Sequence, residues 1–286
     1  MSGLSRRLAV VVLTHNRAAE LRRTLGQLRA LPEQPRIIVV DNGSSDGTAG
    51  MVRRHFPEVE LVAIPCNMGA AARNAGARRA GTPYVAFCDD DTWWEQGALS
   101  TAVDLLDRYP QVAVLSARVL VAEEGREDPT CALMAESPLP SDQLPGPALL
   151  GFLAGACVVR RQPFLDAGGY EPNFFIGGEE ALLTLDLAAA GWSVVYAPQL
   201  TVYHHPSPVR DNRRREHLLV RNAFWVAWMR LPVAHAWRDT LRICRASRPR
   251  VLGAALLAAL RGVPWVVRRR RILPENVLLL YRMLRD

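Results

Sequence analysis

Tyr84-Val85-Ala86-Phe87-Cys88-Asp89-Asp90-Asp91-Thr92 is a short apolar run that ends in three consecutive acids. The apolar part is typical of a strand buried inside a sheet. Carboxylates at the end of such a strand repel one another unless a positive group lies beside them. Mg²⁺ or Mn²⁺ would supply that charge, since both take oxygen ligands from one or two carboxylates plus substrate phosphates. The alternative is a solvated acidic turn that caps a helix starting near Glu95.

Three further apolar runs precede this stretch, and the pattern around them predicts the sheet. Strands are expected at residues 8–13, 36–40 and 59–64, with helical segments between them. This alternation predicts an α/β fold with a doubly wound, mostly parallel, Rossmann-like sheet. Ligands bind such sheets beyond the carboxyl ends of the strands. We therefore expect the polar residues that follow the strands, at 14–17, 41–44 and 89–91, to line one crevice.

The second half of the chain continues in the same style. It predicts helices at 97–109 and 181–190 and strands at 112–121, 152–159 and 193–196. Residues 123–148 mix acids with five prolines, and a loop of this length inside a domain is usually functional or mobile.

Composition and charge limit the class of protein. The 286 residues are 49% hydrophobic and 22% charged, which is ordinary globular composition. Residues 1–200 carry 17 Arg and 23 acids, whereas residues 201–286 carry 18 Arg and 5 acids. The basic C-terminal segment predicts an anionic neighbour such as phosphate, a membrane surface or nucleic acid. Five unpaired cysteines fit reduced thiols in a cytosolic protein, and no apolar run is long enough to predict a transmembrane helix.

Five motifs occur in the order in which one protein family carries them. They are VVLTHNR at 11–17, VVDNGSSDGT at 39–48, NMGAAARNAG at 67–76, DDD at 89–91 and GGEE at 177–180. Together they resemble the family 2 glycosyltransferases, which have the GT-A fold and mostly transfer a sugar from a nucleotide diphosphate donor with inversion. The resemblance covers about residues 8–205 and rests on the five motifs together.

The resemblance implies a donor pocket. Asp41 resembles the residue that reads the nucleotide base, and Arg73 resembles the arginine beside the base and diphosphate, where a cation near a helix start suits phosphate oxygens. Asp89 resembles the residue that touches ribose. The alternatives are a turn and helix cap for Asp41 and a surface arginine for Arg73. The implied nucleotide-sugar-binding residues are Thr14, Asn16, Arg17, Asp41, Asn67, Arg73, Asp89 and Asp90.

The resemblance also implies a catalytic base and an acceptor side. Glu180 stands where the family has its base, although Asp is more frequent there, and Leu182 is apolar where many members carry a second acid. Glu179 and Trp93 are the implied acceptor-binding residues. The alternative for the two glutamates is that they simply favour the positive end of a helix dipole.

The implied metal ligands are Asp91 and His204, for Mg²⁺ or Mn²⁺, with Asp90 kept as a candidate. The two histidines His204 and His205 follow the last expected strand, where GT-A enzymes often place a metal-binding histidine. We prefer His204. The alternative is a structural histidine, since imidazole suits a hard ion less well than carboxylate does.

The C-terminal segment predicts helices rich in Arg, Trp and Leu. Residues 210–215 resemble a basic loop that closes over the diphosphate. The helices at 218–231 and 251–260 suit either an anionic membrane surface or a cap packed on the sheet. We expect a GT-A catalytic domain at 1–205, with a nucleotide-sugar half at about 1–110 and an acceptor half at about 111–205, followed by a basic helical region at 206–286.

The function that these features predict is a metal-dependent, inverting glycosyltransferase. It would move a sugar from a UDP- or dTDP-sugar to an acceptor hydroxyl on a saccharide, a lipid-linked intermediate or a small molecule, in cell-surface polysaccharide, glycolipid or glycoconjugate synthesis. We expect it in the cytoplasm, with peripheral contact to the inner face of the cell membrane, and without a nucleic-acid partner. The alternatives are a nucleotidyltransferase acting on sugar phosphates and a non-catalytic nucleic-acid-binding module.

Overall fold

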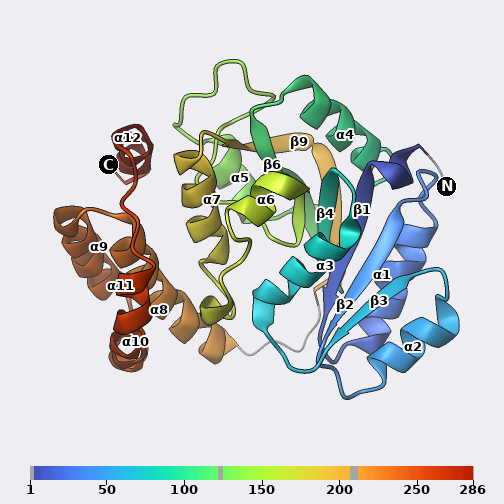
Figure 1. The fold of residues 1–286 in the computed structure, drawn as a ribbon, viewed down its shortest axis with the longest axis horizontal. Helices are drawn as coiled ribbons and strands as arrows, with labels where there is room; N and C mark the ends of the chain where they lie inside the picture. Colours follow the sequence, from blue (N-terminus) through green and yellow to red (C-terminus); the bar gives the residue numbers. More distant parts are fainter. Residues whose placement is uncertain (1–2, 122–124, 207–211, 286) are drawn as a thin grey trace.

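The protein is built around one mixed sheet with helices on both faces, followed by a group of C-terminal helices (Figure 1). A computed structural model describes residues 3–121, 125–206 and 212–285. Within these residues nine strands form the sheet. They are β1 (Leu8–Thr14), β2 (Arg36–Asn42), β3 (Glu60–Ile64), β4 (Tyr84–Asp89), β5 (Thr92–Trp94), β6 (Val112–Val121), β7 (Arg126–Glu127), β8 (Ala156–Arg160) and β9 (Ser193–His204).

Helices connect the strands and then continue alone to the C-terminus. Those of the sheet region are α1 (Ala18–Arg29), α2 (Thr48–His55), α3 (Arg73–Ala80), α4 (Ala98–Arg108), α5 (Pro129–Ala135), α6 (Arg161–Asp166) and α7 (Glu179–Ala189). Short 3₁₀ turns are η1 (Leu4–Arg6), η2 (Gly69–Ala72) and η3 (Pro172–Phe174). The C-terminal helices are α8 (Asn212–Arg230), α9 (Val233–Ala246), α10 (Pro249–Arg261), α11 (Val263–Arg268) and α12 (Glu275–Met283).

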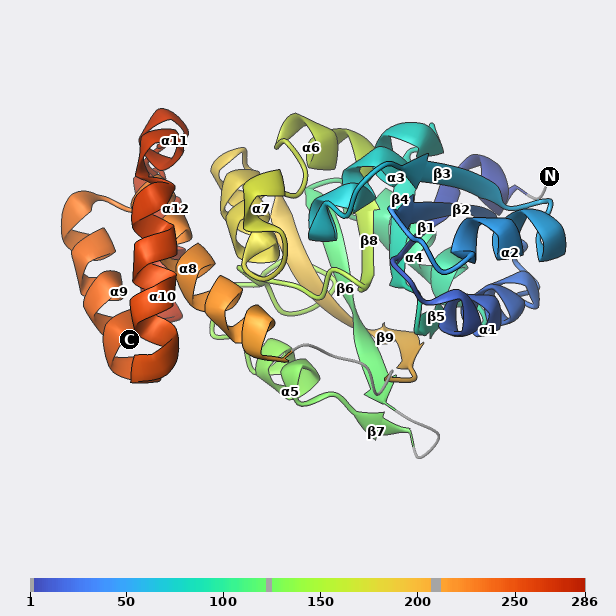
Figure 2. The same cartoon turned by 90° about the horizontal axis from the view of Figure 1, so that it is seen from below.

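The strand order is β3-β2-β1-β4-β8-β6-β9-β5, with β7 added beside β6. The pairs β1–β2, β1–β4, β2–β3 and β6–β9 are parallel, whereas β8 runs antiparallel to both β4 and β6. Helices α1 and α3 lie on opposite faces of the sheet (Figure 2), so strands such as β1 are covered on both sides and read as continuous apolar runs. The predicted mostly parallel α/β sheet is therefore confirmed.

The last long strand differs from its prediction. We expected it to end at Tyr196. Pro198 follows, and proline cannot donate to a sheet ladder. In the structure β9 continues to His204, and its pairing with β6 jumps from Ala117–Ala197 to Arg118–Thr201. A bulge therefore absorbs the proline, and His204 is the last residue of β9 instead of lying after the strand.

Two other segments also differ from their expected structure. The acid triplet runs into a short strand, β5, where a turn before a helix was the alternative considered. The expected loop at 123–148 contains β7 and α5 in its described part. Of the predicted basic loop at 210–215, residues 210 and 211 lie outside the described residues, and α8 begins at Asn212.

The buried apolar residues form two cores. The larger one surrounds the sheet, and the second joins α8–α12 to Phe174 and to Leu182 and Leu185 of α7. The C-terminal helices thus share a core with residues that precede the predicted boundary at 205. No helix in the described part of the chain is long and apolar enough to cross a membrane.

Candidate active site

The predicted crevice residues meet at one edge of the sheet. Thr14 pairs with Asp41 across β1 and β2, and Leu13 pairs with Asp89 across β1 and β4. The three strands are parallel, so their carboxyl ends coincide. The end of β9 joins this edge from the other side, because β5 pairs Thr92 with His204 directly after the acid triplet.

Asp90 and Asp91 form a buried acidic pair around one arginine. Each is 5% exposed. Arg17 Nη1 lies 3.1 Å from Asp90 Oδ1 and 3.2 Å from Asp91 Oδ2, and Thr14 donates to Asp90 Oδ2 at 2.9 Å. Burial raises the pKa of Asp90 to about 7, with Arg17 opposing the shift and the charges of Asp89 and Asp91 adding to it. The solvated-turn reading of the triplet is wrong for these two side chains, which are enclosed.

His204 completes this cluster. Its Nε2 lies 3.6 Å from Asp91 Oδ1, while the main-chain N–H of His205 donates to the Asp91 carbonyl at 2.9 Å. The backbone contact explains the geometry: the start of β5 and the end of β9 are held together, so one imidazole faces one carboxylate.

The residues of this cluster fit a divalent cation only in part. The buried carboxylates of Asp90 and Asp91 share the guanidinium of Arg17, so positive charge is favoured at this site, as a cation would require. Asp91 and His204 offer one oxygen and one nitrogen ligand, a mixed set that Mn²⁺ accepts more readily than Mg²⁺. Within the described residues no group of three or more metal-binding side chains converges. A cation here would therefore need ligands from the substrate or water, as Mg²⁺ and Mn²⁺ sites at phosphates commonly do.

Asp89 is the most open of the three acids and is paired with Arg73. Its side chain is 43% exposed, and Arg73 Nη2 donates to Asp89 Oδ1. Gly155, just before β8, lies against the same carboxylate: a Cβ at position 155 would stand 2.3 Å from Asp89 Oδ2. A glycine is needed here because any larger residue would push the carboxylate aside.

Arg73, predicted to lie beside the base and diphosphate of the donor, is buried in the structure, so the alternative of a surface arginine is wrong. Its side chain is 7% exposed. Burial opposes its charge, yet the neighbouring acids Asp89, Glu179 and Glu180 more than offset this and raise its pKa. Arg73 therefore links the acid triplet to the glutamate pair, a role that helix spacing could not reveal.

Glu179 and Glu180 open helix α7 directly after two glycines. Gly177 and Gly178 have φ of 86° and 87°, a left-handed backbone that other residues rarely adopt. Glu179 is buried and its Oε2 has no hydrogen-bond partner among the described residues, whereas Glu180 is half-buried. Burial raises the pKa of both carboxyl groups, and the charge of Glu180 adds to the shift of Glu179. Of the two, Glu180 has the better access to a substrate.

The loop that leads to this pair is held by the C-terminal helix α8. Asn222 is fully buried, and its Nδ2 donates to the carbonyls of Phe174 at 3.0 Å, Ile176 at 3.1 Å and Gly177. Arg221 Nη2 donates to the Phe174 carbonyl at 2.8 Å and to Asn222 Oδ1 at 2.8 Å. The two side chains satisfy loop carbonyls that no sheet or helix ladder reaches.

The remaining predicted donor residues shape the turns at this edge. Asp41 is buried and accepts from the Ser44 N–H at 3.0 Å, so the turn reading holds for it. Asn16 Oδ1 accepts from the Ser45 N–H at 2.7 Å, which ties the loop after β1 to the loop after β2. Asn67 Oδ1 accepts from the Asn42 side chain at 2.9 Å. These contacts leave their roles toward a nucleotide as predictions.

Trp93 does not converge with the acids. It stacks on Tyr203 with ring centroids 6.1 Å apart. These two residues are paired across β5 and β9, one step along from Thr92 and His204. Because side chains alternate along strands, Trp93 lies on the opposite face of this ladder from His204. Its acceptor role stays a prediction.

Comparison with known proteins decides the family. The family model described as "Glycosyl transferase family 2" matches residues 9–168, more than half of the 286-residue chain. The chain belongs to glycosyltransferase family 2. The predicted family and glycosyltransferase activity are thereby confirmed, and the two alternatives, nucleotidyltransfer and non-catalytic nucleic-acid binding, lose their basis.

Two relatives of this glycosyltransferase come from Mycobacterium tuberculosis. The N-acetylglucosaminyl-diphospho-decaprenol L-rhamnosyltransferase is 26% identical over 274 residues, spanning 82% of this chain and 88% of the relative. The pre-mycofactocin glycosyltransferase is 34% identical over 223 residues, spanning 73% of this chain but 45% of the relative.

A solved structure gives the fold comparison. The mannosyltransferase of Pyrobaculum calidifontis, in complex with GDP-Man and Mn²⁺, matches with a TM-score of 0.62 and 20% identity over 90% of this chain and 75% of that chain. At this identity the likeness concerns the fold, and it confirms the GT-A architecture predicted for this glycosyltransferase.

Sequence reasoning missed several residues that shape the site. Gly155 and Asn222 lie outside all five motifs. Arg17 was named as a nucleotide-sugar-binding residue, but its contacts with Asp90 and Asp91 were not predicted. Gly155 stands before an apolar strand in the sequence, but only its contact with Asp89 in the structure shows why a glycine is required there.

Proposed function

We propose that this glycosyltransferase is metal-dependent and inverting, and that it uses a nucleotide-diphosphate sugar, with UDP- and dTDP-sugars as the expected donors. The observation that carries the proposal is the separation of two acidic groups at one sheet edge. Asp90 and Asp91 lie after β4, Glu179 and Glu180 open α7, and Arg73 is charge-coupled to the glutamates while paired with Asp89. One group can serve the donor while the other serves the acceptor.

Glu180 is the proposed base. It removes the proton from the acceptor hydroxyl as that oxygen attacks the anomeric carbon from the side opposite the leaving group. The bond from the anomeric carbon to the diphosphate oxygen breaks, so the nucleoside diphosphate leaves and the configuration at that carbon inverts. A positioned base typically contributes about 10²–10⁴-fold in rate.

Asp91 and His204 are the proposed protein ligands of Mg²⁺ or Mn²⁺. When bound, the cation would neutralise the charge that develops on the leaving diphosphate. The mixed oxygen and nitrogen donors support Mn²⁺ over Mg²⁺. The Mn²⁺ named with the Pyrobaculum mannosyltransferase supports a divalent cation in a protein of the same fold.

The proposed donor pocket lies over the carboxyl ends of β1, β2 and β4. Asp41 offers its second carboxylate oxygen to the nucleotide base, since the first is taken by the turn to Ser44. Asp89 is open enough to accept from ribose hydroxyls, and Arg73 fixes the direction of its carboxylate. Thr14, Asn16 and Asn67 hold the loops that frame this space.

The proposed acceptor is a lipid-linked saccharide, in synthesis of a cell-surface polysaccharide or glycolipid. The name of the Mycobacterium tuberculosis rhamnosyltransferase, which includes a diphospho-decaprenol acceptor, supports this class over free saccharides and small molecules. An acceptor of this kind lies in a membrane, so we include peripheral contact with the inner face of the cell membrane in the proposal.

The test is a thermal-shift screen of nucleoside diphosphates with and without Mn²⁺. A ligand at about 100 times its Kd adds roughly 2.7 kcal/mol to the free energy of unfolding. We expect UDP or dTDP to stabilise the protein in a Mn²⁺-dependent way, and Asp91→Asn to abolish that dependence. Asp104→Asn, at an exposed position of α4, is the matched control. If Mn²⁺ raised the nucleotide-induced stabilisation of the Asp91→Asn variant as much as it does in the native chain, the metal assignment would be refuted.

A further inference from the structure

The C-terminal helices carry nearly all the large apolar side chains that the described residues leave exposed. Of fourteen such side chains, twelve lie at or after Leu219. The same segment, residues 201–286, holds 18 of the 35 arginines and only 5 acids. Scattered exposed apolar residues are normal on a protein surface, but their concentration in one basic region indicates an interaction surface.

Helix α9 has one face packed and one face open. On the packed face Asp239 is buried and accepts from the Tyr281 hydroxyl, while Thr240 accepts from Trp228 Nε1 at 3.0 Å. On the open face Val233, Trp237 and Leu241 are each more than half exposed. Their spacing of four residues places them in one stripe along the helix.

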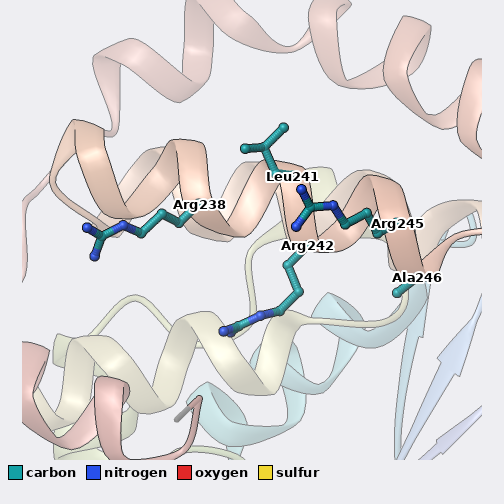
Figure 3. Close-up of a pocket in the computed structure, with 5 residues that line it drawn as sticks. All are labelled: Arg238, Leu241, Arg242, Arg245 and Ala246. Atoms are coloured by element: carbon teal, nitrogen blue, oxygen red, sulfur yellow. The ribbon is translucent and has the colours of Figure 1, made fainter.

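Arginines lie beside this apolar stripe and at its C-terminal end. Arg238 and Arg242 follow Trp237 and Leu241 by one residue, and Arg245 continues the stripe one turn later. Figure 3 shows these three arginines around a shallow hollow that Leu241 and Ala246 also line. Arg242 is held by the Arg285 carbonyl at 3.1 Å and lies 3.6 Å from Asp239. In the part of the chain that the structure describes, neither Arg238 nor Arg245 has a carboxylate partner.

We propose that this open face of α9 lies on an anionic lipid surface, with Trp237 and Leu241 in the headgroup–acyl boundary and Arg238, Arg242 and Arg245 on lipid phosphates. A bilayer interface offers an apolar layer and negative charge within one helix width, which is the pattern of this face. A nucleic acid would leave the apolar stripe unburied, and a second copy of the chain packed face to face would set arginine against arginine.

The inference deepens the proposed membrane contact and does not depend on the reaction. Helix α9 packs on α8, and α8 binds the loop before Glu180 through Asn222. The proposed lipid-binding helix and the loop that carries the proposed base therefore both contact α8. The placement of α9 and α8 side by side at the end of the molecule remote from β3 is visible in Figures 1 and 2.

The test measures co-sedimentation of the full chain with vesicles, at one fixed salt concentration and without substrates. One set of vesicles is phosphatidylcholine alone, and the other is phosphatidylcholine mixed with phosphatidylglycerol. We expect binding to the mixed vesicles only. Each arginine near an anionic surface contributes about five-fold in partitioning, so Arg238→Glu with Arg245→Glu should lower binding by at least about 25-fold.

Matched control variants come from the sheet region. Arg53→Glu with Arg54→Glu, exposed on α2, makes the same change in net charge, and Leu133→Ser, exposed on α5, matches Leu241→Ser. We expect both controls to bind vesicles as the native chain does, and Leu241→Ser to weaken binding without any change of charge. Thermal unfolding of each variant verifies that it is folded.

Three results would overturn the inference. The first is equal loss of vesicle binding in the α2 and α9 charge variants, which would mean that only net charge matters. The second is no vesicle binding together with tight, salt-dependent binding to DNA or RNA. The third is no vesicle binding together with a dimer that Leu241→Ser dissociates. None of these depends on whether the enzyme transfers a sugar, so a failed glycosyltransferase assay would not be mistaken for a failed lipid contact.

Discussion

Replacing Asn222 should damage catalysis although the residue touches no proposed substrate atom. Its side-chain amide donates to the carbonyls of Phe174, Ile176 and Gly177, just before the proposed base Glu180. In Asn222→Ala the Ile176 and Gly177 carbonyls lose this donor inside a buried region, whereas the Phe174 carbonyl keeps the donors of Arg221 and of the Ile176 N–H. The loop would then rearrange to reach water or other donors, and Glu180 would move with it.

The magnitude follows from the lost hydrogen bonds. A net hydrogen bond is worth about 1 kcal/mol, and a buried polar group left unpaired costs about 1–3 kcal/mol. One amide shared by three carbonyls should therefore cost roughly 2–4 kcal/mol in the free energy of unfolding. A misplacement of about 1 Å at a catalytic group costs on the order of 10²-fold in rate. We expect kcat to fall by about that factor while nucleotide affinity changes little, because the proposed donor pocket lies on β1, β2 and β4.

A second substitution separates hydrogen bonding from packing. Asn222→Asp keeps the shape of the side chain but sets a carboxylate oxygen against the same three carbonyls. If the donor matters, Asp should be worse than Ala in both kcat and stability. If only the filled volume matters, Asp should be milder. Asn276→Ala, an exposed asparagine of α12, is the control for asparagine loss in the same region.

The assay is release of nucleoside diphosphate under saturating donor, with urea unfolding of the same samples. A folded Asn222→Ala variant with native kcat would refute the idea that α8 positions the base. So would an Asp variant more active than the Ala variant.

Three further predictions concern the acids themselves. Glu180→Gln should keep nucleotide binding and lose about 10²–10⁴-fold in kcat. Glu179→Gln should keep most activity at neutral pH, because burial raises the pKa of Glu179 and glutamine resembles its protonated form. Equal losses of kcat in the two variants, measured by steady-state kinetics, would contradict the assignment of Glu180 as the base. Because burial also raises the pKa of Glu180, kcat should fall on acidification at a pH above the ordinary glutamate value of about 4.3, and a pH–rate profile that is flat down to that value would count against this base. Gly155→Ala should displace the Asp89 carboxylate and weaken nucleotide affinity by calorimetry, and an unchanged Kd would argue that Asp89 does not contact the donor.

The sheet could be predicted from the sequence because its strands are local signals. Strands buried on both faces give continuous apolar runs, and β1, β2 and β4 each end where polar residues begin. The end of β9 could not be predicted in the same way. Pro198 reads locally as the end of a strand, and only the bulge opposite β6 shows how the strand continues.

The candidate site was also predictable only where the signal is local. The aspartates at 89–91 and the glutamates at 179–180 could be named because they lie in motifs and at strand or helix ends. Their partners could not be named, because the partners are distant in sequence: Arg17 meets Asp90 across 73 residues, and Asn222 meets Phe174 across 48. Such contacts depend on the packing of the whole fold, and no local pattern of residue types encodes them.

The C-terminal helices show what this division means for the enzyme. The sequence predicts them as a basic extension after residue 205, because their composition changes there. In the structure, Phe174 and Leu182 from the other side of that boundary belong to the same apolar core as α8–α12, and Phe174 packs on Trp225 with ring centroids 5.9 Å apart. The Phe174 carbonyl is also bound by Asn222. The segment that carries the proposed base is thus folded partly by the extension. The change of composition near residue 205 reflects a change in surface charge. It is not a boundary of the packed core, because the core that holds the segment of Glu179 and Glu180 in place includes residues from both sides of it.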